Sequence, residues 1–365
     1  DRRFMRMFQV LEPDGRVASD FDRPMSAMEG EMVCGGCAAK VAARPLQRAL
    51  SRLPPVVDPD VAVGPEDADD VVAWRDGGRL VVQNVDAFSA FTDDPWVVGR
   101  VAAHNATSDV WAKGLAPRFA MATVQIPTDD DHEETLFQVM AGLRASLDPE
   151  GIALLGGHTT LGEKLVVGLV VTAIADELPW RNRGARPGDT LVLTRPLGTG
   201  VLFHADMAGR APGRAVDAVL NTMLRGNRLA SELARGQAVH ACTDVTGFGL
   251  AGHLAEVVRG SGCGAVLELA ALPAFPAVEG LLAQGERSTF HEQNRELLKV
   301  VAAKGDAARH PRFELLFDPQ TAGGLLFATP DPDGLIAALE AGGDTAWRIG
   351  VCTEPHESGA VFEVV

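Results

Sequence analysis

The chain has 365 residues, 46% of them hydrophobic and 22% charged, which is the composition of a folded globular protein. This length favours two α/β domains over a single core. The net charge of −16 argues against general binding to nucleic acid or an anionic membrane surface, because no basic excess is present. No apolar run reaches the ~18 to 20 residues of a membrane helix. The five cysteines, an odd number, fit a reducing compartment, so we expect a cytoplasmic protein.

Residues 1–32 are polar and interrupted by Pro and Gly, without sustained periodicity. This pattern predicts a linker or the tail of a preceding domain. The sequence starts at Asp1 without a methionine, and no charged-then-apolar leader follows. We therefore expect a piece of something longer, without a secretion signal.

The motif CGGCAAK brings together Cys34, Cys37 and Lys40. A structural zinc site would need two more ligands at short spacing, and the sequence offers no such pair. A redox dithiol is possible, since CxxC can cycle to a disulfide. Cys37 could instead be a nucleophile or a thiol that handles a chalcogen. Lys40 would then lower the pKa of the Cys37 thiol and bind phosphate. A flexible glycine loop with two small side chains is the fourth reading, and the motif alone leaves these open.

Residues 33–178 alternate between strand-like and helical patterns, which predicts one α/β domain. The strand-like runs are rich in β-branched residues and cover 79–88, 119–127 and 164–176. Between the first two runs, Asp94 can cap a helix, Pro95 can take its first position, and Gly114 suits its far end. We expect a helix of about five turns here.

On that helix Val101, Asn105 and Asp109 recur every four residues and share one face. One interpretation is an exposed strip in which Asp109 pairs with Lys113. The other is a functional face that presents Asn and Asp. The pattern alone does not decide between them.

A second helix is predicted after TDDD, with an apolar stripe of Leu136, Val139, Met140, Leu143 and Leu147. Acids at its start favour the helix dipole. We therefore assign no catalytic role to Asp129, Asp130 and Asp131.

Other carboxylates stand at strand ends or glycine turns. Asp69 and Asp70 precede an apolar pair, Asp86 closes the strand RLVVQNVD, and Asp244 comes before glycines that lead into a helical pattern. Any one of them could be an ordinary turn residue. Together they suggest Mg²⁺ ligands, because magnesium is held by a few carboxylates plus nucleotide phosphate oxygens.

Residues 179–189, PWRNRGARPGD, break the pattern with Pro, Gly and Arg. A new strand pattern follows, so we expect a domain boundary here and a second α/β domain over residues 187–365.

Eight motifs follow one another from residue 34 to the carboxyl end: CAAK at 37–40, EDADD at 66–70, VD at 85–86, DDPWVVGRVAAHNATSDV at 93–110, GGHTT at 156–160, PLGTGVL at 196–202, TDVTGFGLAGHL at 243–254 and DPQTAGGLL at 318–326. In these motifs and their order the chain resembles selenophosphate synthetase (selenide, water dikinase). TDVTGFGL and DPQTAGG are the specific ones, because relatives in the same ATP-binding superfamily carry different sequences there. Residues 1–30 lie outside the resemblance and look like a connector from fused forms that carry a flavin-dependent, NADH-dehydrogenase-like domain.

The resemblance implies the fold of aminoimidazole ribonucleotide synthetase. This fold has an N-terminal α+β domain, whose sheet pairs with that of a second subunit in a homodimer, and a larger C-terminal α/β domain. The implied reaction makes selenophosphate from selenide and ATP, with release of AMP and orthophosphate.

The resemblance also implies roles for individual residues. Cys37 matches the catalytic cysteine and Lys40 the catalytic lysine of the family. The matches to its metal-binding aspartates, which would hold Mg²⁺, are Asp70, Asp109 and Asp244. The matches to its nucleotide or active-site positions are Asp86, Asn105 and the turn Gly156, Gly157 and His158.

The chain departs from the family pattern at several positions. Asn84 and Val85 replace a usual Thr-Thr pair, and His104 stands where threonine is usual. The loop after GGHT reads TLGEK, where an acidic sequence is usual. Cys34 is an addition relative to the simplest members, and it could resolve an oxidised Cys37.

Two alternatives remain at this stage. The chain could be another ATP-dependent synthetase of the same superfamily that acts on a different nucleophile, which the altered segments 84–85 and 159–164 favour. It could also be a non-catalytic CxxC redox accessory domain that serves a flavin-dependent partner.

Overall fold

The computed structural model describes residues 49–50, 52–128 and 131–365. The predictions for residues 1–32, for Cys34, Cys37 and Lys40, and for Asp129 and Asp130 therefore lie outside the described residues. The described part of the chain contains no helix that is long and apolar enough to cross a membrane.

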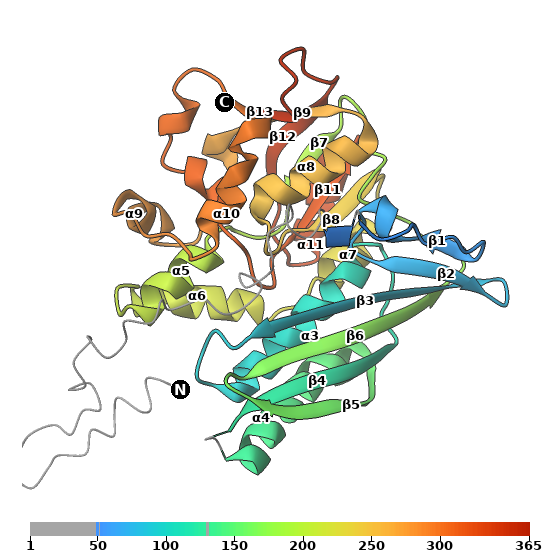
Figure 1. Cartoon of the computed structure of the whole chain (residues 1–365). Coiled ribbons are helices and arrows are strands. Elements are labelled where there is room, and N and C mark those ends of the chain that lie inside the picture. Colours follow the sequence, from blue (N-terminus) through green and yellow to red (C-terminus); the bar gives the residue numbers. More distant parts are fainter. Residues whose placement is uncertain (1–48, 51, 129–130) are drawn as a thin grey trace, which may run out of the picture. The chain divides into compact units, whose positions relative to one another are not determined.

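The first half of the described chain forms a six-stranded sheet in the order β1-β2-β3-β6-β4-β5 (Figure 1). Only the edge pair β4 and β5 is parallel, and the other neighbours are antiparallel. The strands are β1 (Val61–Val63), β2 (Val72–Asp76), β3 (Arg79–Ser89), β4 (Phe119–Pro127), β5 (Ala153–Gly162) and β6 (Val166–Ala175). All three predicted strand regions are confirmed. The structure adds β5, within which residues 156–158 were expected to form a turn.

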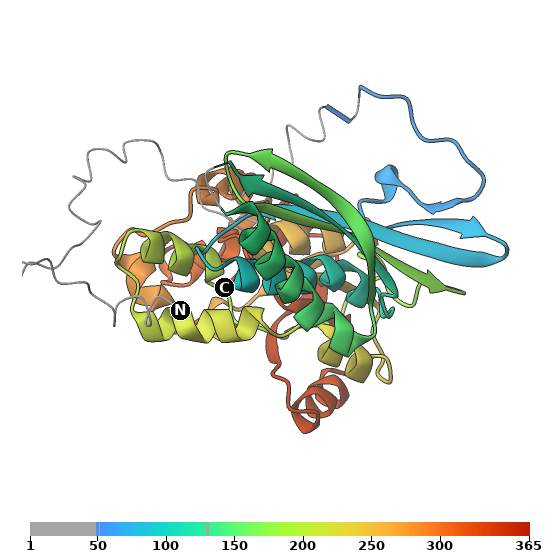
Figure 2. The same cartoon turned by 90° about the horizontal axis from the view of Figure 1, so that it is seen from below.

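Helices α3 (Pro95–Trp111) and α4 (His132–Leu147) lie against one face of this sheet (Figures 1 and 2). The predicted cap is confirmed, because the Asp94 carboxylate accepts hydrogen bonds from the backbone N–H groups of Trp96 and Val97. The two helices cross closely at Gly99 and Gly142, where a Cβ would lie 2.3 Å and 2.1 Å from backbone oxygens of the other helix. This close crossing fixes α3 on the sheet.

On the opposite face of the sheet, the described residues place no helix. Val85 on β3 and Met121 on β4 are both paired with Val170 on β6, so they share this face. Their exposed fractions are 68% and 47%. An antiparallel sheet can leave one face to water, but that face is then usually polar. Here it is partly apolar.

The second half of the described chain builds a seven-stranded mixed sheet in the order β10-β13-β9-β12-β7-β11-β8. Its strands are β7 (Thr190–Leu193), β8 (Ala241–Asp244), β9 (Gly264–Leu267), β10 (Val301–Ala303), β11 (Leu325–Thr329), β12 (Trp347–Thr353) and β13 (Phe362–Val364). Its helices are α5 (Thr199–Met207), α6 (Gly213–Met223), α7 (Arg228–Ala234), α8 (Gly249–Ser261), α9 (Val278–Ala283), α10 (His291–Arg295) and α11 (Pro332–Ala341). Two short 3-10 turns are used below: η4 (Pro65–Asp67), between β1 and β2 in the first half, and η9 (Phe313–Phe317), between β10 and β11 in the second.

The segment 179–189 connects β6 to β7. It is not an exposed linker throughout, since Trp180 and Asn182 are buried. Trp180 packs edge-on against Phe327 of β11, with 5.7 Å between ring centroids. The connector is therefore part of the packed structure, and its side chains can contribute to a site.

Candidate active site

Asp70 lies between η4 and β2, where its carboxylate is held by three side chains. The Lys113 ammonium lies 2.8 Å from Oδ2, and Asn182 Nδ2 donates to Oδ1 over 2.9 Å. Thr243 Oγ1 donates to Oδ2 over 3.0 Å. These donors come from the end of α3, from the connector and from β8, so the two halves of the chain meet at Asp70.

The neighbouring Asp69 is almost fully buried between two cations. Its Oδ1 lies 2.8 Å from Lys113 Nζ, and its Oδ2 accepts a 2.6 Å hydrogen bond from Arg181 Nε. Burial by itself would raise the pKa of Asp69, but Lys113 and Arg181 outweigh it and lower the pKa below its usual value. Burial would likewise lower the pKa of Lys113, but Asp70 and Asp69 raise it. The pair of Asp69 and Lys113 is therefore ionic.

Asp244 ends β8 and is 1% exposed, and the helix that was predicted to follow its glycines is α8, which begins at Gly249. Asp244 Oδ2 accepts a 2.7 Å hydrogen bond from Ser108 Oγ on α3. Ser108 Oγ in turn accepts from Asn227 Nδ2 over 2.8 Å. One residue before Asp109, α3 thus supports a carboxylate of the other sheet.

Asp70, Asp244 and His253 form a group that could hold a metal ion. One ligand atom from each lies within 4.8 Å of the other two. The donor set fits Mg²⁺ through its two carboxylates, since magnesium prefers oxygen ligands. His253 Nε2 accepts a 3.1 Å hydrogen bond from the backbone N–H of Thr246, so its lone pair is already engaged. His253 therefore fits better as a support of the loop after Asp244 than as a magnesium ligand.

The predicted face of α3 is confirmed as a polar contact surface. Asn84 Nδ2 on β3 donates to Asp109 Oδ2 over 2.7 Å, and Asn105 Nδ2 donates to Asp86 Oδ2 over 2.7 Å. Lys113 is fully buried and bonded to Asp69 and Asp70, so the exposed strip considered for Asp109 and Lys113 is wrong.

Asn105 also reaches the DPQTAGG segment. Its Oδ1 accepts a 2.9 Å hydrogen bond from the backbone N–H of Ala322. The Ala322 carbonyl accepts a 2.7 Å bond from Arg195 Nη1. Ala322 has a φ of 48°, a left-handed conformation that an alanine adopts at a cost. The hydrogen bonds to Asn105 and Arg195 hold Ala322 in this conformation. Because Asn105 also donates to Asp86, they connect the DPQTAGG segment to Asp86.

Two details differ from the sequence-based expectation. Asp86 does not close its strand, because β3 continues to Ser89 through pairing with β6. Gly156, Gly157 and His158 do not form a turn, because they lie within β5. A Cβ on Gly157 would come within 1.8 Å of the Ala122 carbonyl oxygen, so glycine here permits close strand pairing. Glycine pairs suit both turns and such contacts, which explains the error.

The structure of one chain does not bring His158 to Asp86. Asp86 lies in a row of paired residues with Leu169 and Ala122, both buried, whereas His158 is paired with Thr123 on the face without helices. The two residues are three strands apart, a lateral distance of about 14 Å. They therefore lie on opposite faces of the sheet.

The departures from the family pattern now have structural settings. Asn84 binds Asp109, so the amide supplies a hydrogen-bond donor at that position. Val85 points to the open face, away from the aspartates. His104 is buried, and burial lowers its pKa to about 3, so it is neutral beside Glu150. A Cβ on Gly226 would lie 2.8 Å from His104 Nδ1, which places His104 where the two halves of the chain meet.

No site role was predicted from the sequence for Lys113, Arg181, Asn182, Ser108 or His253. The signal for Lys113 was available, since it follows Asp109 by four residues, but its true partners are distant in sequence. Arg181 and Asn182 fall in the segment 179–189, which was predicted as a domain boundary because of its Pro, Gly and Arg content.

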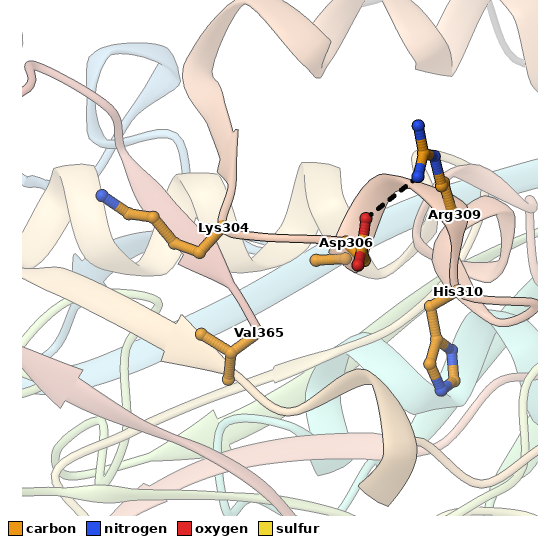
Figure 3. Close-up of a pocket in the computed structure, with 6 residues that line it drawn as sticks. Lys304, Asp306, Arg309, His310 and Val365 are labelled. Carbon is orange, nitrogen blue, oxygen red and sulfur yellow. Dashed lines mark hydrogen bonds and ion pairs between the residues drawn. The ribbon is translucent and has the colours of Figure 1, made fainter.

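A pocket of about 420 Å³ lies elsewhere, lined by Lys304, Asp306, Ala307, Arg309, His310 and Val365 (Figure 3). Lys304 is paired with Glu363 at 2.8 Å, and Arg309 with Asp306 at 3.2 Å. No predicted site residue that the structure describes lines this pocket, and its lysine and arginine already have carboxylate partners.

Two family models match the chain. Residues 66–175 match the N-terminal domain of AIR synthase related proteins, and residues 186–363 match the C-terminal domain. A selenide, water dikinase from Pelobacter propionicus is 40% identical over 333 residues, which cover 88% of this chain and 94% of the relative. The chain belongs to the selenide, water dikinase family. A second family member, from Desulfitobacterium hafniense strain Y51, is 38% identical over 84% of this chain and 90% of its own length.

A solved structure supports the fold assignment. AaThiL complexed with AMPPCP and TMP is 17% identical and has a TM-score of 0.64, with 88% of this chain and 93% of that chain covered. At this identity the likeness shows the fold alone. The predicted two-domain fold of the AIR synthase type is confirmed.

Proposed function

We propose that this family member makes selenophosphate from selenide, ATP and water, with release of AMP and orthophosphate. Membership in the selenide, water dikinase family supports the reaction. The observation that carries the site is the meeting of Asp70 and Asp244, from the two halves of the chain, within one group of possible metal ligands. In the proposal the reaction takes place in the cytoplasm.

Asp70, Asp109 and Asp244 are the proposed Mg²⁺ ligands. Bound Mg²⁺ would clamp the triphosphate, screen its charge against an incoming anion and stabilise the charge that develops on the transferred phosphoryl group. The chain's own contribution is orientation. Lys113, Asn182 and Thr243 hold Asp70, Ser108 holds Asp244, and Asn84 holds Asp109.

Asp86 and Asn105 are the proposed nucleotide-side residues. Asn105 is bonded to Asp86 through its amide nitrogen and to the Ala322 N–H through its oxygen. We propose that this bridge keeps Asp86 in place when ATP binds. Use of ATP is supported by the kinase name of the relatives and by the nucleotide analogue in the AaThiL complex.

Cys37 and Lys40 are the proposed catalytic pair. A thiolate at Cys37 would handle the selenium nucleophile, and the Lys40 ammonium would lower the thiol pKa and meet phosphate. Cys34 has an accessory role in this proposal. The proposed division of the chain is a linker at 1–32, an ATP- and metal-binding domain at 33–178 and a second domain at 187–365. A fused or adjacent flavin-dependent oxidoreductase domain stays a prediction.

The protein is proposed to act as a homodimer through the open face of the six-stranded sheet. Val85 and Met121 are apolar and exposed on this face, which favours its burial against a second copy of the chain. His158 and Gly156 on β5 lie on the same face, whereas Gly157 is paired with Ala122 in the row of Asp86 on the face that the helices cover, so a second copy would be needed to bring His158 into a site. Val85→Asp should produce monomers in light scattering, whereas Val351→Asp on β12 of the other sheet should not. Dimers of Val85→Asp would contradict this interface.

The reaction is tested by AMP release from ATP with and without selenide, under anaerobic conditions with Mg²⁺. We expect AMP release that depends on selenide in the natural chain, its loss in Cys37→Ser and Lys40→Met, and its retention in Cys34→Ser. Turnover of ATP with another nucleophile only would favour a different synthetase of the superfamily. Absence of ATP turnover, or equal loss in Cys34→Ser and Cys37→Ser with a normal Lys40→Met, would favour a redox accessory domain.

A further inference from the structure

Lys113 is a fully buried lysine just beyond the end of α3. A buried ammonium group is costly unless it is paired and hydrogen-bonded. Lys113 Nζ lies 2.8 Å from Asp69 Oδ1, 2.8 Å from Asp70 Oδ2 and 3.2 Å from the Cys242 carbonyl oxygen, and it also donates to Asn182 Oδ1. All four acceptors are oxygen atoms. The ammonium is thus surrounded as a bound monovalent cation would be.

The four oxygens come from three segments that are distant in sequence: residues 69–70, the connector and β8. Lys113 draws these segments together from a fourth position. Asn182 uses both ends of its amide here, since Oδ1 accepts from Lys113 while Nδ2 donates to Asp70 Oδ1 over 2.9 Å. Both oxygens of Asp70 therefore have fixed donors. Its orientation toward Asp244 is set by the chain itself.

We propose that Lys113 is a positioning residue that acts as a built-in monovalent cation, holding Asp70 in the orientation that the metal site needs. The role of Asp70 in this inference rests on the proposed function. The cation-like surroundings of Lys113 do not depend on it. K⁺ and NH₄⁺ are similar in size and are both bound by oxygen atoms, including backbone carbonyls. Either ion should fit the four oxygens once the lysine side chain is removed.

The first test needs no activity. Lys113→Ala is heated in KCl, NH₄Cl or choline chloride at equal ionic strength, and the unfolding midpoint is measured. We expect a higher midpoint in K⁺ or NH₄⁺ than in choline, because choline is too large for the space that is left. The natural chain should show no such difference. Equal midpoints in all three salts, or a variant that stays unfolded in all three, would overturn the built-in cation.

The second test separates orientation from charge. Lys113→Met combined with Asp69→Asn removes one cation and one anion, so the net charge of the cluster is unchanged. The Mg²⁺ concentration for half-maximal AMP release should rise by about 10-fold or more, the usual effect of losing a group that orients a metal ligand. Arg183→Met is the matched control, since Arg183 is paired with Asp67 in the same turn, whereas the ion pairs of Asp69 and Asp70 in the described chain are with Lys113 and Arg181.

An unchanged or lowered Mg²⁺ requirement in the double variant would overturn the positioning role. An equal shift in Arg183→Met would overturn it too, because the effect would then be general to this turn. If the natural chain released no AMP with selenide, the proposed function would fail. The salt dependence of Lys113→Ala would still decide whether Lys113 replaces a bound cation.

Discussion

Two regions of the described chain each hold a buried carboxylate, Asp69 in one and Asp318 in the other, in opposite surroundings. Asp69 has Lys113 and Arg181 within hydrogen-bond distance, and its pKa is lowered. Asp318, after η9, is also fully buried, but no lysine or arginine in the described part of the chain forms an ion pair with it. Burial raises the pKa of Asp318 to about 7. Burial alone therefore does not identify an aspartate of a functional site. The side chains that surround its carboxylate are the better indication.

The hydrogen bonds of Asp318 indicate a structural role. Its Oδ2 accepts from the backbone N–H of Gly200 over 3.1 Å and from Gln320 Nε2 over 2.9 Å. Gly200 is the second residue of α5, so Asp318 closes the start of this helix. The cluster at Asp70 instead collects donors around a carboxylate that belongs to a group of possible metal ligands.

The largest expected effect contrasts these two regions directly. Asp70→Asn and Asp244→Asn should each lower selenide-dependent AMP release by about 100-fold or more, the size typical of losing one preorganised charge-stabilising group. The melting temperature of Asp244→Asn without nucleotide should change little, because the change relieves crowding with Asp70. Asp70→Asn should lower it, because buried Lys113 loses one of its two carboxylate partners. Asp318→Asn should keep activity within a few-fold. Comparable losses in all three variants would erase the distinction.

A smaller effect is expected at Asn84, which supports Asp109 from β3. Asn84→Ala removes the 2.7 Å hydrogen bond to Asp109 Oδ2 and a 2.9 Å bond to the Ala106 carbonyl. AMP release should fall by about 10-fold, since the proposed ligand loses one orienting donor. Gln83→Ala, on the other face of the same strand, is the control. Normal steady-state rates in Asn84→Ala would show that Asp109 does not depend on this amide.

The last expected effect is on stability, which Asp318 should make dependent on pH. The unfolded chain releases this proton near the ordinary pKa of 3.8, whereas the folded chain keeps it to about pH 7. The contribution to the free energy of unfolding is therefore complete below about pH 4 and is lost as the pH rises to 7. The loss is about 1 kcal/mol per pH unit within this window.

Urea unfolding of the natural chain and of Asp318→Asn at pH 5, 6 and 7 measures this contribution. The stability of the natural chain relative to the variant should decrease steadily over the series. Parallel curves would mean that Asp318 titrates normally in the folded protein.

Local patterns in the sequence were sufficient for the elements around the site. Asp94 and Pro95 predicted the start of α3, and β-branched runs predicted β3, β4 and β6, because capping and strand preferences act over a few residues. The partners of the aspartates could not be predicted in this way. Asn182 lies 112 residues from Asp70, and Asn105 lies 217 residues from Ala322. Only the packing of the two halves of the chain brings such pairs together.

The placement of Asn182 has a consequence for the length of the connector. Connecting segments usually tolerate insertions because they cross the surface and carry few contacts. Here Trp180 is packed against Phe327, Arg181 reaches Asp69 and Asn182 reaches Asp70, in three consecutive residues. One added residue after Trp180 would turn the side chains that follow and carry the amide away from Asp70. The length of the connector between the two sheets therefore determines where the Asn182 amide lies, and it should be as constrained as the length of a core strand.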